Sequence, residues 1–144
     1  MAPVIMLDTH VVVWLHTNRV TELSLRAIRE IDANDLAVSP IVELELAYLH
    51  EIGRTAGPAS EILGALGSRM GLTVAQIGFG PLCSTAVEVT WTRDPFDRML
   101  VAHAITAGLP LLTKDASILA NLDLGFWDWT SRLPASRSRA DNEV

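Results

Sequence analysis

Cysteine, basic side chains and long apolar runs are scarce in this sequence of 144 residues, and each shortage excludes a class of protein. The single cysteine, Cys83, rules out an internal disulfide and a cysteine-based zinc cluster, fits a reducing compartment, and is expected to be a small core residue. No apolar segment is long enough to span a bilayer, and no basic leader precedes the first apolar run, so we expect neither a membrane anchor nor a signal peptide. These shortages together predict a soluble cytoplasmic protein.

Acidic residues outnumber basic ones by 17 to 11, and the net charge is −6. This balance argues against a protein that holds nucleic acid on a broad basic face. It does not exclude a nuclease, because bound divalent cations supply positive charge where phosphate is handled. We also find no Ser-His-Asp or Cys-His arrangement, so the sequence gives no sign of a nucleophilic side chain.

With 49% hydrophobic residues, the chain is rich enough in apolar side chains to build one domain with its own core. We expect this domain to cover residues 1–133. Residues 134–144 are polar and lack aromatic side chains, which predicts a disordered tail.

Short apolar runs alternate with helical segments along this domain. A continuous apolar run such as Val4 to Leu7 is typical of a strand that is buried on both faces of a parallel sheet. We expect strands at 4–7, 36–38, 72–74, 109–113 and 126–129, and helices at 9–16, 21–33, 40–52, 59–69, 81–91, 94–107 and 117–122. This alternation predicts a parallel sheet in a three-layer α/β fold.

The segment RDPFDRMLVAHA begins a helix with acidic residues in its first turn. Asp94 before Pro95 is a strong signal for a helix N-terminus, and we interpret Asp94 mainly as the cap. Helical geometry places Asp97 on the same side as Leu100 and Val101, a side that should be buried. A carboxylate there needs a partner.

A second acidic residue falls on a side of a helix that is predicted to be buried. The helix after Ser39-Pro40 has an apolar stripe that we assign to Ile41, Leu44, Tyr48, Leu49 and Ile52. Glu45 lies within this stripe, whereas Glu43 projects to the opposite side and is expected to be a surface charge.

Two further acids, Asp8 and Asp115, each follow a predicted strand. Parallel sheets bind ligands beyond the carboxyl ends of their strands, so we expect Asp8, Glu45, Asp97 and Asp115 to meet in one pocket. Two carboxylates about 4 Å apart repel by roughly 4 kcal/mol at an effective dielectric constant of about 20. A cation relieves this repulsion, and ligands that are all oxygen favour Mg²⁺ or Mn²⁺ over Zn²⁺.

Such an ion lowers the pKa of a bound water, orients it for in-line attack on a phosphodiester and neutralises the developing charge. Three other residues are candidates near the pocket. Thr113 either adds a hydroxyl or is an ordinary strand residue. Arg98 contacts substrate phosphate or solvent, and His10 is the histidine expected nearest to the acids.

Four segments in this order, LDTHVVVWL, SPIVELELA, RDPFDRMLVAHA and LLTKD, resemble the PIN domain, specifically the VapC-type toxins of bacterial toxin–antitoxin pairs. The resemblance implies a sheet of strand order 3-2-1-4-5 and a magnesium-dependent endoribonuclease that cleaves RNA. It also implies a homodimer and a cognate antitoxin as partner. By the same resemblance, the catalytic and metal-binding residues are Asp8, Glu45, Asp97 and Asp115, with Asp94 as an accessory residue.

Two other functions are compatible with parts of this pattern. A receiver-like signalling module also gathers acids around Mg²⁺ and has a lysine after a late strand, a position that Lys114 could fill. Such a module needs a phosphoacceptor aspartate after its middle strand, but no acid lies between Glu61 and Glu88 in this sequence. A catalytically idle PIN-like module would act through protein contacts. Such a module is expected to lack at least one pocket acid, and none is missing here.

Overall fold

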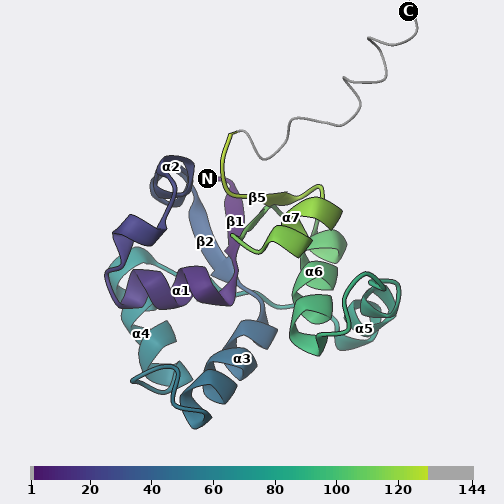
Figure 1. Cartoon of the computed structure of the whole chain (residues 1–144), viewed down its shortest axis with the longest axis horizontal. Coiled ribbons are helices and arrows are strands. Elements are labelled where there is room, and N and C mark those ends of the chain that lie inside the picture. The colour runs from purple at the N-terminus through teal and green to yellow at the C-terminus, as the bar shows by residue number, and fades with distance from the viewer. Residues whose placement is uncertain (1, 130–144) are drawn as a thin grey trace, which may run out of the picture.

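The computed structural model describes residues 2–129, and its centre is a parallel sheet of five strands in the order β3-β2-β1-β4-β5 (Figure 1). The fold class and the strand order are therefore as predicted. The predicted tail at 134–144 lies outside the described residues. The strands are β1 (Val4–Leu7), β2 (Asp35–Val38), β3 (Thr73–Val74), β4 (Leu111–Leu112) and β5 (Gly125–Phe126).

Helices flank this sheet and connect its parallel strands. In the described part of the chain they are α1 (Thr9–His16), α2 (Leu25–Ala33), α3 (Pro40–Glu51), α4 (Ala59–Met70), α5 (Phe79–Val87), α6 (Pro95–Ala107) and α7 (Ala116–Asn121), with a 3-10 turn η1 (Val20–Glu22) before α2. Helix α3 packs with α4, and α5 lies along α6 (Figure 1). Between residues 2 and 129, we find no helix with the length and apolar character needed to cross a membrane.

Strand β1 lies at the centre of the core. Met6 and Leu7 are fully buried, as the continuous apolar run predicts for a strand covered on both faces. Leu7 pairs with Leu112 of β4, so the residues that follow these two strands emerge side by side. Asp8 and Thr113 are those residues.

Helix α2 begins later than predicted. It starts at Leu25 rather than at residue 21, because the Ser24 hydroxyl accepts a hydrogen bond from the Ala27 amide and caps the helix there. Residues 20–22 form the separate 3-10 turn η1. Leu25 itself is 60% exposed. The buried residues of α2 are Ala27 and Ile31.

Helix α3 is rotated about its axis relative to the predicted stripe. Its buried residues are Val42 and Leu46, whereas Leu44, Tyr48 and Ile52 are exposed. The predicted stripe is therefore wrong at these three positions, whereas its other two members, Ile41 and Leu49, are half-buried. Glu45 is still half-buried, because it lies between the packed side of α3 and the end of the sheet.

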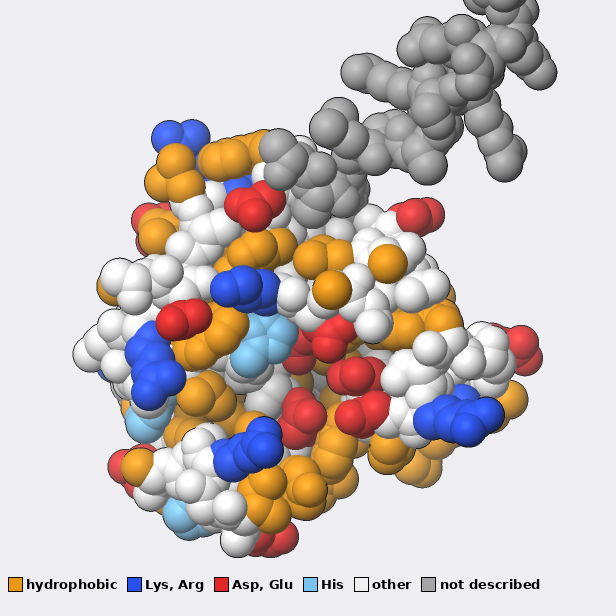
Figure 2. Space-filling model, in the orientation of Figure 1, with side chains coloured by type: hydrophobic (Ala, Val, Ile, Leu, Met, Phe, Trp, Pro, Cys, Tyr) orange, Lys and Arg blue, Asp and Glu red, His pale blue; other side chains and the backbone are white. Residues whose placement is uncertain are grey.

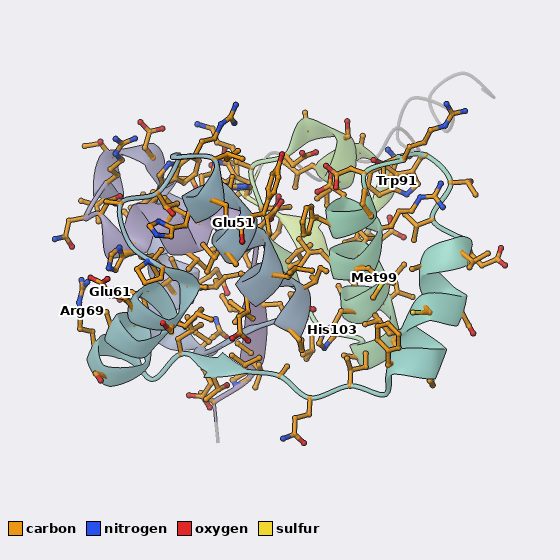
Figure 3. The ribbon with its side chains drawn as sticks, turned by 90° about the horizontal axis from the view of Figure 1, so that it is seen from below. Glu51, Glu61, Arg69, Trp91, Met99 and His103 are labelled. Carbon is orange, nitrogen blue, oxygen red and sulfur yellow. The ribbon has the colours of Figure 1, made fainter. Side chains whose placement is uncertain are left out.

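Helix α5 ends at Val87, not at residue 91 as predicted, so residues 88–94 form a loop that leads to α6. Its inner side forms a small apolar cluster with α6, in which Met99 points toward α5 (Figure 3). Cys83 is half-buried and lines a shallow apolar groove here rather than the main core. The late strands β4 and β5 are also shorter than predicted.

Candidate active site

A single hydroxyl joins the ends of β1 and β4. Asp8 is 5% exposed; its Oδ1 accepts a hydrogen bond from the Thr9 amide at 2.7 Å and caps α1. Thr113 Oγ1 donates to Asp8 Oδ2 at 2.6 Å and accepts from the Asp115 amide at 3.1 Å. Of the two roles left open for Thr113, the structure therefore supports the hydroxyl role, linking the two acids at the strand ends.

Two more acids cap helices at the same edge of the sheet. Asp115 Oδ1 accepts from the Ile118 amide at 2.9 Å and begins α7. Asp94 Oδ1 accepts from the Phe96 amide at 2.8 Å and the Asp97 amide at 3.3 Å, so the interpretation of Asp94 as a cap is confirmed. Each carboxylate uses one oxygen for its helix, which leaves the other directed to solvent or a ligand.

The predicted acids converge on one pocket of about 400 Å³. Figure 2 shows acidic side chains gathered around a hollow at the centre of one face, with basic side chains on the surrounding surface. The carboxylates that line the pocket come from the ends of β1 and β4, from α3 and from the start of α6: Asp8, Glu45, Asp94, Asp97 and Asp115. Asp94 thus adds a fifth acid to the expected four.

Crowded negative charge changes the protonation of this pocket. Burial, together with the negative charges of Asp94, Asp115, Asp8 and Glu45, raises the pKa of Asp97 to about 7. Burial also raises the pKa of Glu45; the neighbouring Thr9 hydroxyl opposes this rise, although no hydrogen bond of normal geometry joins the two groups. Asp97 therefore exchanges its proton near neutral pH, and a cation in the pocket would favour its ionised form.

The donor set of the pocket fits a hard cation. All of its acidic ligands are oxygens, and the buried Thr9 hydroxyl beside them has no hydrogen-bond partner. Within residues 2–129, no three acidic, histidine or cysteine side chains stand close enough to hold an ion as they are. Repulsion between carboxylates favours this separation, so an ion would have to draw them together.

His10 is fixed beside the pocket by both of its ring nitrogens. Nε2 accepts a hydrogen bond from the Lys114 amide at 2.9 Å, which places the proton of the neutral ring on Nδ1. Nδ1 lies 3.5 Å from Asp8 Oδ2. The expectation that His10 lies near the acids is confirmed, and its ring connects the ends of β1 and β4.

Two other candidates lie away from the pocket. Arg98 does not line it; its Nε donates to the Thr92 carbonyl at 2.8 Å, and its side chain borders the apolar groove beside α5. Of the two roles left open for Arg98, this position favours the one that does not involve substrate. His103 is buried between α6 and α3, 2.7 Å from Ser39 Oγ (Figure 3), and burial lowers its pKa. It is a structural histidine.

The sequence analysis missed six residues of the pocket lining, of which three are polar and three are apolar: Thr9, Arg54, Thr55, Val13, Trp14 and Leu49. The position of Thr9 directly after Asp8 is a usable signal, because a residue next to a capping acid shares its location. Arg54 and Thr55 come from the loop after α3, and nothing in their spacing predicts where that loop folds.

The sequence of this chain matches a known protein family. A model of the PIN domain matches residues 5–123. The chain belongs to the PIN-domain family. The domain is 36% identical over 117 residues to Ribonuclease VapC22 of Mycobacterium tuberculosis (strain ATCC 25618 / H37Rv), a match that covers 77% of this chain and 86% of that protein. The predicted family is therefore confirmed.

Solved structures share the fold of this PIN domain at low sequence identity. One is a toxin–antitoxin complex from Klebsiella pneumoniae, with a TM-score of 0.58, 16% identity and coverage of 85% of this chain and 95% of that one. Another is VapBC2 from Rickettsia felis bound to a DNA fragment from their promoter, with a TM-score of 0.58, 19% identity and coverage of 87% and 99%. At this identity the likeness establishes the fold.

Proposed function

We propose that this PIN-domain protein is a magnesium-dependent endoribonuclease toxin of a toxin–antitoxin module, acting in the cytoplasm. The observation that carries the proposal is the convergence of five carboxylates on one pocket at the carboxyl ends of the strands. The 36% identity to a protein named as a ribonuclease supports RNA as the substrate.

Asp8, Glu45, Asp97 and Asp115 are the residues that would hold the metal, with Asp94 beside them. Bound Mg²⁺, or Mn²⁺ in its place, would lower the pKa of a coordinated water and neutralise charge on the phosphoryl oxygens. The four side chains differ in their tasks. Asp8 is held in place by Thr113 and the Thr9 amide, whereas Asp97 has a pKa near neutrality and loses its proton readily when positive charge enters the pocket.

A protein partner is part of the same proposal. The structural neighbours from Klebsiella pneumoniae and Rickettsia felis are toxin–antitoxin complexes, which supports a cognate antitoxin as the inhibitor of this chain. We also propose that the nuclease domain spans residues 1–133, that residues 134–144 form a tail outside it, and that the toxin is a homodimer.

The test is cleavage of a single-stranded RNA by purified protein with Mg²⁺ and with EDTA. Cleavage is expected only with the metal, and Asp8→Asn and Asp97→Asn should each lower its rate by about 100-fold or more, since changes even in the residues that support metal ligands cost about 10- to 100-fold. Circular dichroism should show that both variants fold, because each removes a repulsive charge.

The matched control is Glu43→Gln, which removes an exposed acid on α3 outside the pocket lining. This variant should cleave RNA like the wild type. Cleavage that persists in EDTA, or that survives Asp8→Asn, contradicts the proposal. A folded wild-type protein that cuts no RNA in Mg²⁺ would instead favour the idle PIN-like module.

A further inference from the structure

The acidic pocket has a second wall of a different chemical character. This aromatic wall consists of His10, Val13, Trp14 and Leu49, and Arg54 lies beside it. The pocket has a volume of about 400 Å³. A hydrated ion with about six waters of about 30 Å³ each would occupy roughly 180 Å³, which is less than half of this volume. Space remains for part of a substrate against the aromatic wall.

The rings of the aromatic wall are held rigidly. His10 and Trp14 have ring centroids 4.9 Å apart, and the buried ring of Trp127 contacts Trp14 in an edge arrangement with a centroid distance of 6.1 Å. Both nitrogens of His10 are engaged, by Asp8 and by the Lys114 amide, yet its side chain is 30% exposed. The exposed part of His10 is therefore ring surface rather than a free donor or acceptor.

Two cationic side chains, Lys114 and Arg54, border this wall. Lys114 Nζ lies over the ring of Trp14, 5.7 Å from its centroid, and Arg54 lines the pocket. Neither forms an ion pair with any residue in the described range, although the chain carries a net charge of −6. Aromatic rings flanked by unpaired cations are the features that proteins use to hold single-stranded nucleic acid.

We propose that the aromatic wall binds one nucleobase of single-stranded RNA next to the phosphate that is cut. The base stacks on Trp14 beside His10, and Lys114 and Arg54 contact the flanking phosphates. An exposed lysine over an aromatic ring is held more weakly than a stacked base, so the base displaces the flexible Lys114 side chain toward a phosphate. An apolar protein segment would leave both cations unpaired. The inference rests on the proposed ribonuclease function.

The experiment combines changes in the protein with changes in the RNA. The cut site is first mapped by sequencing the fragment ends of a longer transcript. A short single-stranded RNA that contains this site is then made in three forms. One form is intact, and in each of the other two an abasic nucleotide replaces the nucleotide on one side of the cut. In the wild type, one of the two abasic positions should lower kcat/KM by about 5- to 150-fold, the range expected for loss of one stacked base. Trp14→Leu should lower kcat/KM of the intact RNA by a similar factor.

The decisive result is the combination of both changes. If the base stacks on Trp14, removing the base should have little further effect once Trp14 is gone. The Trp14→Leu protein should therefore cut the intact RNA and the abasic RNA at rates that differ by no more than about twofold. Trp14→Phe should retain most of the wild-type rate, because it keeps an aromatic face. Trp129→Leu is the matched control, since Trp129 is 54% exposed beside Arg29 and outside the pocket.

A second measurement uses Lys114, the single lysine in the sequence. In the Asp97→Asn protein with Mg²⁺, the same RNA should protect Lys114 from an amine-reactive reagent, and the N-terminal amine serves as the internal reference. This measurement does not depend on whether Trp14→Leu folds. Unchanged labelling of Lys114 contradicts the proposed phosphate contact.

Failure of this inference and failure of the proposed function give different results. If the wild type cuts no RNA, both are rejected. If the wild type cuts RNA but folded Trp14→Leu cuts it equally well, or if the two changes act independently, only the stacking proposal is overturned. The aromatic wall would then be left as a contact surface for a protein segment.

Discussion

Asp97 combines two properties that rarely coexist in a stable helix. It lies in the first turn of α6, where the helix dipole stabilises a negative charge, but it also lies near four other carboxylates. The second effect dominates, because burial and the neighbouring charges raise its pKa to about 7. We interpret the raised pKa of Asp97 as a feature of a site that binds a cation, where the crowded negative charge lowers the stability of the metal-free protein.

This charge crowding predicts how stability depends on pH without metal. In the unfolded chain Asp97 has its ordinary pKa of 3.8, and in the folded protein its pKa is about 7, so the folded state binds the proton more tightly. The contribution of Asp97 to the free energy of unfolding is complete when the pH lies below its pKa in the unfolded chain. This contribution is lost as the pH rises through its pKa in the folded protein. In EDTA, the wild type should therefore unfold at a lower temperature at about pH 8 than at about pH 5.

Thermal unfolding of Asp97→Asn provides the comparison. This variant should lose less stability over the same range, and Mg²⁺ should raise the unfolding temperature of the wild type at the alkaline end. His103 acts in the opposite direction, since burial lowers its pKa and its contribution is lost as pH falls below the ordinary value of 6.5. The difference between variant and wild type isolates Asp97, and parallel pH profiles would contradict the charge-crowding account.

At the scale of one element, α3 shows why the buried side of a helix can be misassigned. Apolar residues occupy most of its positions, so several stripes of similar hydrophobicity compete. Only the packing of α3 against α4 and α6 selects the side that contains Val42 and Leu46. Local pattern alone does not contain this information.

The corrected orientation of α3 predicts opposite results for two leucines of the same helix. Leu46 is fully buried, and Leu46→Ala should lower the free energy of unfolding by about 2–5 kcal/mol. Leu44 is 58% exposed, and Leu44→Ala should change it by less than about 0.5 kcal/mol. Chemical denaturation measures both values, and equal losses would show that the assignment of the buried side is wrong.

The elements themselves were largely predictable, and their boundaries were less so. Continuous apolar runs identified the strands, and Ser39-Pro40 and Asp94-Pro95 marked the starts of α3 and α6 correctly. Helix α2 was started too early because the Ser24 cap was not recognised. The residues before it form the 3-10 turn η1, none of whose residues is buried.

At the scale of the whole molecule, the order of the strands brings distant acids together. Asp8 and Asp115 are far apart in sequence, but pairing of β1 with β4 places both at one edge. This follows from parallel topology, which is why four pocket acids could be predicted to meet. Arg54 could not be predicted, because its location depends on how the loop after α3 folds over the pocket.

The central claim is that this edge of the sheet binds a divalent cation that serves RNA cleavage. Its most direct test is a crystal structure of the wild type with Mn²⁺, in which anomalous scattering locates the ion. We predict a peak bounded by the carboxylates of Asp8, Glu45, Asp97 and Asp115, and its loss in Asp8→Asn. An active protein with no peak in this pocket, or with its ion elsewhere, would contradict the account.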